Sequence, residues 1–395
     1  MDNQGLNILI AGGKTGGHLF PGIAIAQAFS DKVPGTGILF VGTGQPFETS
    51  TLDRYGFAHT AISVSPIKGR GVKEKFTALV RLPLSLVQAI AIIRKFKPDL
   101  VLGVGGYSSG PVVAGARLLR IKTAIQEQNT IPGITNRILS RICHVVFTSF
   151  EETRGLSKRA VVYLTGNPVR KLKTKCKGEG PAPGAGQVPG AENSPCERCP
   201  SGRTREHDPA VFNLLVTGGS QGARSINQAM MGAMALMDVP VDAPASICLI
   251  HQTGISDEAE VAGTYRSLNI NGETRAFFDD LPDRMAEADL IVARAGAGTI
   301  SEITRHGKPS ILVPYPHAAD DHQRFNAEAV VNRGGAEMIL DRELSPERLK
   351  TAIEALQNNR EKRLSMGRAA RGMAILDPAG AIVDICLSMI EKKGT

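Results

Sequence analysis

The sequence predicts an α/β protein built from two doubly wound domains that face each other across a cleft. Short apolar runs alternate with helical stretches along most of the 395 residues, a pattern typical of parallel sheets covered by helices. A strand, a glycine-rich loop and a helix open the chain at Asn7–His18, and the same arrangement returns at Phe212–Arg224. The length also exceeds the roughly 250 to 300 residues at which a single core stops growing. We therefore expect ligand to bind beyond the carboxyl ends of both sets of strands.

The first strand, Ile8–Ala11, leads into the loop Gly12–His18 and then a helix. Such a loop presents unpaired N–H groups at the positive end of the helix, which suits a phosphate or an oxyanion. It is not a Walker A loop, since His18 follows the last glycine where that motif has lysine. A plain strand-to-helix turn is the alternative. His18 favours a site, because imidazole transfers protons near neutral pH.

The remaining predicted strands follow at regular intervals. In the first half they are Ile38–Val41, Leu100–Val104, Thr123–Ile125, Val145–Phe147 and Val161–Leu164. In the second half they are Ile247–Ile250, Leu290–Ala293 and Ser310–Val313. The strand Ile38–Val41 ends in glycines rather than in an acidic residue, which argues against a dinucleotide-binding fingerprint.

The segment 170–210 between the halves is rich in proline and glycine and has almost no large apolar residues. It cannot bury enough surface to offset its chain entropy, so we expect a disordered insert. Cys196 and Cys199, with Cys176 before and His207 after, are an alternative set of zinc ligands. Because the spacing of these residues is irregular, we expect no metal there.

The segment Ile67–Pro98 combines many basic residues with apolar residues that are partly at helical spacing, interrupted at Pro83. One interpretation is an amphipathic helix docked on the sheet with a basic outer face, which we expect for most of the segment after Pro83. The other places Ile67–Leu84 on an anionic membrane surface. The sequence leaves both open.

Composition limits the classes of partner and compartment. The chain has 46 basic against 38 acidic residues, which favours an anionic partner. Five tyrosines, no tryptophan and no alternation of basic and aromatic residues make nucleic acid the least favoured one. There is no apolar run near 18 residues, and the six cysteines are scattered. Because a polar start leads directly into a predicted strand, we expect no signal peptide. We expect a cytoplasmic protein with reduced thiols.

Polar and small residues gather where the predicted strands end. They are Gly103–Gly110, Glu127-Gln128-Asn129 with amides able to bind sugar hydroxyls, Gly166–Arg170, Arg294–Glu302 and Asp321–Asn326. Each segment taken singly is as consistent with a cap or a turn. Their shared position at strand ends, on both sides of one cleft, indicates a binding site.

These residues resemble the MurG glycosyltransferases, a family with the GT-B arrangement of two Rossmann-like domains. The resemblance covers nearly the whole chain except the insert. The motifs that carry it are Gly12–His18 with Pro21, Gly103–Gly110, Gln128-Asn129, Gly166–Arg170, Gly218–Arg224 and Arg294–Glu302. It implies a membrane and acceptor domain at 1–169, onto which a helix at about 377–395 packs back, and a UDP-GlcNAc-binding domain at 211–376.

The resemblance implies an inverting N-acetylglucosaminyltransferase. Such an enzyme moves GlcNAc from UDP-GlcNAc to the C4 hydroxyl of MurNAc in undecaprenyl-diphospho-MurNAc-pentapeptide (lipid I), which gives lipid II for peptidoglycan. The implied partners are these two substrates, an anionic membrane surface and cell-wall synthesis proteins. The implied location is peripheral, on the cytoplasmic face of the inner membrane. No cofactor, metal or nucleic acid is implied.

The resemblance also assigns site residues. Thr15, Gly16, Gly17 and His18 face the donor sugar and diphosphate, Asn129 the sugar, Arg170 and Ser220 the diphosphate, Phe277 and Phe278 the uracil, Thr299 the phosphates, Glu302 the ribose, and His322 and Gln323 the GlcNAc hydroxyls. The uracil edge is expected at the Phe278 backbone. The sequence departs from the family at Lys14, usually threonine, and at His322, often glutamine, which puts the sugar contact of His322 in question.

His18 is the candidate general base, although a histidine beside a diphosphate can equally donate a hydrogen bond to it. No Asp-x-Asp occurs in the chain, so we expect helix N-termini and Arg170 to stabilise the departing UDP. Three alternatives remain: a non-hydrolysing UDP-GlcNAc 2-epimerase, another GT-B lipid glycosyltransferase, and a non-catalytic nucleotide-binding module at the membrane.

Overall fold

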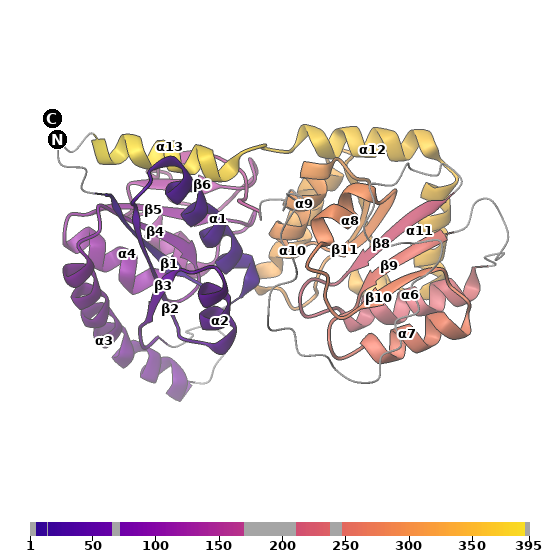
Figure 1. Ribbon diagram of the computed structural model, residues 1–395, viewed down its shortest axis with the longest axis horizontal. Coiled ribbons are helices and arrows are strands. Elements are labelled where there is room, and N and C mark those ends of the chain that lie inside the picture. Colours follow the sequence, from indigo (N-terminus) through magenta and orange to yellow (C-terminus); the bar gives the residue numbers. More distant parts are fainter. Residues whose placement is uncertain (1–4, 14, 65–71, 170–210, 238–246, 392–395) are drawn as a thin grey trace.

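The computed structural model describes residues 5–13, 15–64, 72–169, 211–237 and 247–391, with the backbone alone described for residues 72–82. Two parallel sheets lie in two halves that sit side by side, and helices cover both faces of each sheet (Figure 1). Lys14, Arg170, the insert 170–210 and the segment 65–71 lie outside the described residues.

The N-terminal half holds a seven-stranded parallel sheet in the order β3-β2-β1-β4-β5-β6-β7. Its elements are β1 (Asn7–Gly12), α1 (Gly16–Lys32), β2 (Gly37–Gly42), α2 (Pro46–Arg54), β3 (Ala58–Ala61), α3 (Val72–Phe96), β4 (Leu100–Gly105), α4 (Ser109–Leu118), β5 (Lys122–Glu127), α5 (Ile134–Leu139), β6 (Val145–Thr148) and β7 (Val162–Leu164).

The C-terminal half holds a six-stranded parallel sheet in the order β10-β9-β8-β11-β12-β13. Its elements are β8 (Phe212–Thr217), α6 (Arg224–Leu236), β9 (Ile247–Gln252), α7 (Glu258–Ser267), β10 (Gly272–Arg275), α8 (Leu281–Glu287), β11 (Leu290–Arg294), α9 (Ala297–His306), β12 (Ser310–Val313), the 3-10 turn η1 (Ala319–Asp321), α10 (His322–Val331), β13 (Ala336–Met338), the 3-10 turn η2 (Asp341–Glu343), α11 (Pro346–Gln357) and α12 (Arg360–Gly372). The last helix is α13 (Pro378–Glu391).

The predicted doubly wound architecture is confirmed, and each predicted strand is present. Three strands were not predicted: β3, β10 and β13. All three lie at sheet edges. Edge strands bury less surface and so lack the continuous apolar run that marks a central strand.

Alternate residues of the central strands pack into separate cores. In β1, Ile8 and Ile10 face a core shared with α1, whereas Leu9 and Ala11 face a core shared with α3 and α4. Because helices cover both faces, the buried positions Ile8–Ala11 of this strand are all apolar, which explains the uninterrupted run in the sequence.

Helix α13 returns the chain to the N-terminal half. Its side chains Ile382, Val383 and Cys386 are buried in the core that contains α1, and Asp384 forms an ion pair with Lys32. The preceding helix α12 packs on the C-terminal half through Met366. Figure 1 shows the two helices along one side of the molecule, each over a different half.

Helix α3 runs through Pro83 without ending, so the interruption predicted there is wrong. A proline removes one hydrogen bond from a helix, and packing of the later turns offsets that loss. Ala89 and Ile93 are buried against the sheet, whereas Arg94 and Lys95 are exposed. The docked amphipathic helix is therefore confirmed after Pro83. The side chains of most of Ile67–Leu84, which carry the membrane alternative, lie outside the described residues.

The two halves touch between the segment after β5 and helix α10. Asn326 of α10 accepts hydrogen bonds at Oδ1 from the backbone N–H (2.9 Å) and hydroxyl (3.0 Å) of Thr130, and both residues are buried. Arg137 pairs with Asp320 at 3.1 Å across the same boundary. No helix in the described ranges has both the length and the apolar character needed to span a bilayer.

Candidate functional site

Three loops of the N-terminal half meet at one edge of the sheet. They follow β1, β4 and β5, which are adjacent parallel strands and so end at the same edge. His18 lies in the first turn of α1 and faces Gly105 at the end of β4. A Cβ on Gly105 would lie 2.6 Å from His18 Nδ1, and Gly105 has a φ of +99°. A glycine is needed here because any side chain would displace the ring.

The surroundings of His18 favour a neutral imidazole. Partial burial lowers the pKa of His18, and the nearby His322 lowers it further. Hydrogen bonds to Gln128 and to the Val104 carbonyl act in the opposite direction but do not outweigh burial. The ring is therefore uncharged at neutral pH and has one nitrogen available to accept a proton.

The structure separates the roles of Glu127, Gln128 and Asn129. Glu127 and Gln128 are buried, so of the two amides expected to bind sugar hydroxyls, Gln128 is not accessible to a sugar. Glu127 Oε1 accepts from the Asn129 backbone N–H at 2.9 Å, and Oε2 accepts from Asn136 at 2.9 Å. Burial raises the pKa of Glu127. Only Asn129 keeps solvent exposure, and its Oδ1 accepts a hydrogen bond from Asn326 at 3.1 Å.

In the C-terminal half, Gln252 joins two loops. Its Nε2 donates to the carbonyl of Gly219 at 3.0 Å, and its Oε1 accepts the backbone N–H of Phe278 at 3.0 Å. The Phe278 ring is buried, 4.3 Å from the Arg284 guanidinium, whereas Phe277 is 39% exposed. A uracil therefore cannot stack on the Phe278 ring in this arrangement, and the Phe278 N–H already has an acceptor.

The N-terminus of α9 begins at Gly296 and carries Thr299 in its first turn, with Glu302 one turn further on. Both side chains keep partial exposure. Arg294, at the end of β11, points elsewhere: its guanidinium donates to Asp341 at 2.5 Å and to Ser225 at 2.8 Å. An anion at this helix end would therefore meet backbone N–H groups rather than the Arg294 guanidinium.

Helix α10 begins with His322 and Gln323. The Nδ1 of His322 lies 2.8 Å from the carbonyl of Ala319, which can only accept, so Nε2 is the nitrogen left to face a ligand. Gln323 Oε1 accepts the backbone N–H of Tyr315 at 3.0 Å, which leaves its amide NH₂ for other contacts.

The residues assigned from the resemblance fall into two groups, one in each half. The N-terminal group is Thr15, Gly16, Gly17, His18 and Asn129, and the C-terminal group is Ser220, Phe278, Thr299, Glu302, His322 and Gln323. Arg170 lies outside the described residues. Among the described residues, no three histidine, cysteine, aspartate or glutamate side chains are grouped closely enough to hold a metal ion; the cysteines of the insert are not among them.

Sequence reasoning missed Gln252 and the contact of Asn326 with the opposite half. Gln252 is the last residue of β9, so the rule that polar residues at strand ends mark the site would have found it. The partner of Asn326 lies 196 residues away, and no local pattern indicates such a contact.

Comparison with known proteins identifies the family. Residues 8–148 match the glycosyltransferase family 28 N-terminal domain, and residues 213–379 match its C-terminal domain. The chain is 39% identical over 390 residues to a UDP-N-acetylglucosamine–N-acetylmuramyl-(pentapeptide) pyrophosphoryl-undecaprenol N-acetylglucosamine transferase of Trichlorobacter lovleyi, covering 98% of this chain and 99% of that protein. It is 42% identical over 385 residues to the transferase of that name from Desulfotalea psychrophila, covering 98% and 97%.

Solved structures agree with the fold. The crystal structure of Acinetobacter baumannii MurG matches with a TM-score of 0.72 at 26% identity, covering 96% of this chain and 98% of that one. A UDP-GlcNAc 2-epimerase from Neisseria meningitidis matches with a TM-score of 0.63 at 14% identity, covering 97% and 100%; this likeness extends to the fold alone. The resemblance seen in the sequence is confirmed: the chain has the GT-B fold and belongs to glycosyltransferase family 28, among the MurG transferases.

Proposed function

We propose that this protein transfers GlcNAc from UDP-GlcNAc to the C4 hydroxyl of MurNAc in undecaprenyl-diphospho-MurNAc-pentapeptide, giving lipid II. The observation that carries the proposal is the identity of 39% and 42% to transferases of that name over 98% of the chain. The site supports it, because His18, a neutral histidine of the N-terminal half, lies near His322 of the other half. That other half also offers a helix N-terminus, at α9, suited to a diphosphate.

Each half of the protein binds a different substrate in this proposal. Residues 1–169, with the helix at about 377–395, form the acceptor and membrane domain; 170–210 is an insert, and 211–376 bind UDP-GlcNAc. In the donor domain, Ser220 and the N–H groups near Thr299 hold the diphosphate, joined by Arg170. Glu302 takes the ribose hydroxyls, and the loop at Phe278 takes the uracil.

Transfer begins when the acceptor oxygen attacks the anomeric carbon of GlcNAc from the face opposite UDP. The new C–O bond forms as the bond from that carbon to the UDP oxygen breaks, so the configuration inverts. The hydroxyl proton passes to the free nitrogen of His18. Backbone N–H groups at the start of α9 and after β8 stabilise the negative charge that develops on UDP. Asn129, His322 and Gln323 orient the sugar, together with Thr15, Gly16 and Gly17.

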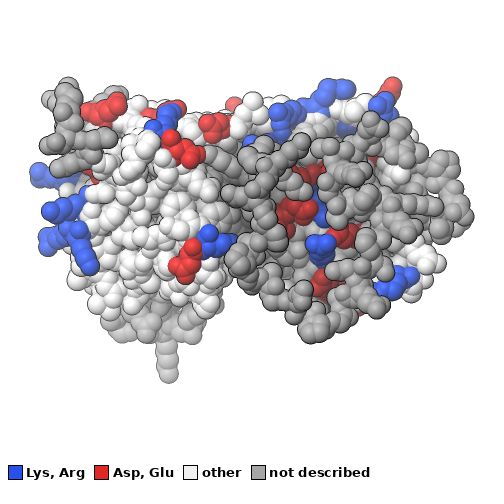
Figure 2. All heavy atoms as spheres, in the orientation of Figure 1, with Lys and Arg blue, Asp and Glu red and all other residues white. Residues whose placement is uncertain are grey.

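A membrane face fits the surface formed by α3, α4 and α5, which pack in sequence. Exposed apolar side chains on and beside these helices are Leu84, Val87, Leu118, Ile134, Ile138 and Ile142. Exposed basic residues beside them are Arg94, Lys95, Arg117, Arg120 and Arg141. Figure 2 shows basic side chains gathered at the left edge of this half. Apolar and basic groups together suit an anionic phospholipid surface. They support a peripheral position on the cytoplasmic side of the inner membrane, which we propose for this enzyme.

Purified protein incubated with UDP-GlcNAc and a short-chain lipid I analogue should release UDP and add one GlcNAc to the acceptor, as read by mass spectrometry. The linkage should be to C4 with inverted configuration. Formation of UDP-N-acetylmannosamine without acceptor would instead reveal an epimerase, and UDP-GlcNAc binding without turnover would reveal a non-catalytic module.

The substitution His18→Ala should lower kcat by roughly 10² to 10⁴, the range for loss of a general base. The base acts only when neutral, and burial lowers its pKa, so the fall of wild-type kcat on the acidic side should lie at lower pH than it would for an imidazole in water. The kcat of the His18→Ala variant should no longer show this fall at acidic pH, which we call the acidic limb of kcat. His59→Ala, on the edge strand β3, is the control and should match wild type. A collapse of UDP-GlcNAc affinity with near-normal kcat would make His18 a donor ligand instead.

The substitution Glu302→Ala should raise KM for UDP-GlcNAc more than it lowers kcat, because ribose contacts are made equally in the ground and transition states. Initial rates over a donor series would measure both constants. Glu260→Ala, exposed on α7, serves as a control of equal charge change. An unchanged KM would remove Glu302 from the donor site.

Charge reversal of Lys68, Arg70, Lys73 and Lys75, or of Arg94 and Lys95, should weaken binding to vesicles that contain anionic phospholipid. Each basic residue near the surface contributes about 1 kcal/mol, and added salt should act in the same direction. Transfer to a water-soluble acceptor should survive. Reversal of Arg360 and Arg368 on α12 is the control for the pair. Undiminished vesicle binding by both sets would place the membrane face elsewhere.

A further inference from the structure

We propose that Gln128 is a positioning residue of the transfer reaction: it holds the His18 imidazole in the tautomer that carries its proton on Nδ1 and leaves Nε2 as the proton acceptor. This inference rests on the proposed function, in which His18 is the general base. It assigns a task to a buried side chain that touches neither substrate.

The orientation of the Gln128 amide is fixed by a main-chain carbonyl. Its Nε2 lies 2.7 Å from the oxygen of Val104, and a carbonyl oxygen can only accept. The second hydrogen of the same nitrogen points to Gln126 Oε1. With both amide hydrogens directed away from His18, Gln128 presents Oε1 to the ring, 3.1 Å from Nδ1. An amide oxygen accepts and cannot donate, so His18 Nδ1 must carry the hydrogen.

A chain of buried amides prevents the side-chain amide of Gln128 from rotating by about 180°, which would exchange its oxygen and nitrogen. Gln126 donates from Nε2 to Ser149 Oγ at 3.2 Å and to Asn167 Oδ1 at 3.3 Å. Ser149 in turn donates to the Glu127 carbonyl at 3.0 Å. Reversing either glutamine amide would bring two acceptors together in a buried place, at a cost of about 1 to 3 kcal/mol for each lost partner. Each donor in the chain thus fixes the direction of the next.

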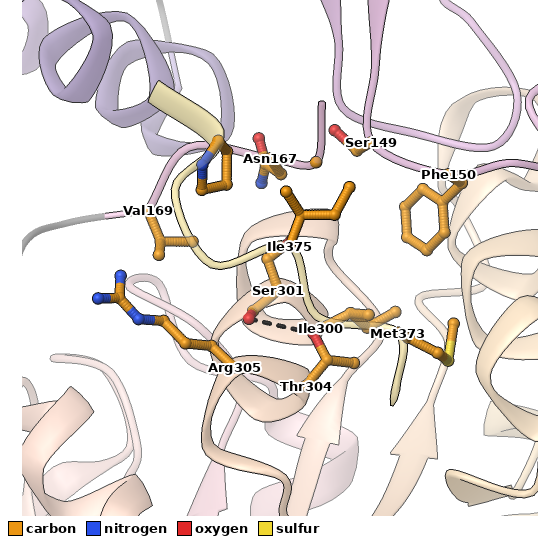
Figure 3. A pocket seen from close by; sticks show the side chains of 12 residues that line it. Ser149, Phe150, Asn167, Val169, Ile300, Ser301, Thr304, Arg305, Met373 and Ile375 are labelled. Atoms are coloured by element: carbon orange, nitrogen blue, oxygen red, sulfur yellow. Dashed lines mark hydrogen bonds between the residues drawn. The ribbon is translucent and has the colours of Figure 1, made fainter. Parts of the chain in front are cut away.

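The chain ends at the joint between the halves. Asn167 lines a pocket there, together with Ser149 and residues of α9 (Figure 3). Its Nδ2 has no hydrogen-bond partner among the described residues, while its Oδ1 is held by Gln126. The amide chain therefore runs from the base at the cleft to the boundary between the two halves, and it lies on the N-terminal half throughout.

A neutral amide suits this task better than a carboxylate. Both would hold a proton on Nδ1, but a carboxylate at this distance would favour the imidazolium and raise the pKa of His18. The amide fixes the tautomer without that charge, so the low pKa produced by burial is kept. Gly105 contributes by leaving room for the ring to approach.

The test compares wild type with Gln128→Met and Gln128→Glu, using protein labelled with ¹⁵N histidine. Long-range ¹H–¹⁵N spectra distinguish a protonated ring nitrogen from one with a lone pair, and loss of the signal in His18→Ala assigns it. Wild type should show hydrogen on Nδ1 and a lone pair on Nε2. Gln128→Met has no acceptor for the Nδ1 hydrogen, so His18 should no longer be held in a single tautomer. The kcat of this variant should fall by at least about tenfold, with KM for UDP-GlcNAc unchanged. The upper limit is the roughly 10⁴-fold loss of kcat that a wrong histidine tautomer causes in other enzymes.

Gln128→Glu keeps the size of the side chain and, in either protonation state, an oxygen that accepts from Nδ1. It should keep the Nδ1 tautomer, retain more turnover than Gln128→Met and shift the acidic limb of kcat to higher pH. If Gln128→Met fails to fold, as judged by its circular dichroism and melting curve, the spectra of wild type and Gln128→Glu still show which nitrogen of His18 carries the hydrogen. Gln252→Met removes a buried glutamine with an equivalent bonding pattern from the other half and should leave the His18 spectrum unchanged.

Hydrogen on Nε2 in wild type would overturn the inference, as would a Gln128→Met variant that keeps both tautomer and turnover. A changed tautomer with unchanged turnover would also overturn the positioning role. Failure of the proposed function looks different: wild type would show the Nδ1 tautomer yet form no GlcNAc-containing lipid product, or His18→Ala would retain full turnover.

Discussion

Parallel strands end at one edge, and this constraint decides where ligand can meet the protein. In each half, neighbouring strands deliver their loops side by side, and the following helices present their N-termini to the same place. The N-terminal sheet brings the loops after β1, β4 and β5 together. The C-terminal sheet does the same for the loops after β8, β9 and β11. A base and an anion site can therefore be built in separate halves without either sheet changing its packing.

The contact between the halves adds a second constraint. Asn326 is fully buried, and its amide bridges Thr130 and Asn129 of the opposite half and the Ala295 carbonyl of its own. Separation of the halves at this point would leave buried polar groups without partners unless water replaced them, at about 1 to 3 kcal/mol each. Asn129 is therefore placed by both halves at once, through Glu127 on one side and Asn326 on the other.

The sequence was sufficient for the architecture because central strands such as β1 carry a continuous apolar run, here Ile8–Ala11. It failed at edge strands such as β3, whose residues Ala58–Ala61 carry no comparable run. It also failed at Pro83, where packing of the later turns of α3 outweighs a local preference to end the helix.

For the site, the sequence indicated which loops meet at the sheet edges but not the directions of their side chains. Polar residues at strand ends marked Gln128 and Asn129 together, yet one faces the interior and the other keeps exposure. Phe277 and Phe278 divide in the same way. Adjacent residues at the end of a strand point to opposite sides, and which side is buried depends on partners such as Val104 and Gln252 that are distant in sequence. For this reason the sequence did not predict the roles of the buried residues Gln128 and Gln252.

The hydrogen-bonded amides behind His18 carry no charge, and this matters because negative charge develops on UDP in the same cleft. In the proposed transfer, the departing UDP gains negative charge. Besides Arg170, the groups proposed to stabilise that charge are backbone N–H groups at helix ends, which carry only partial charges. A carboxylate behind the base would oppose that stabilisation across the low-dielectric cleft. It would also hold a proton on His18 at a pH where the base must be free. An amide chain anchored on a main-chain carbonyl avoids both effects. Its hydrogen bonds fix the orientation of each amide, and so the tautomer of His18, without adding net charge.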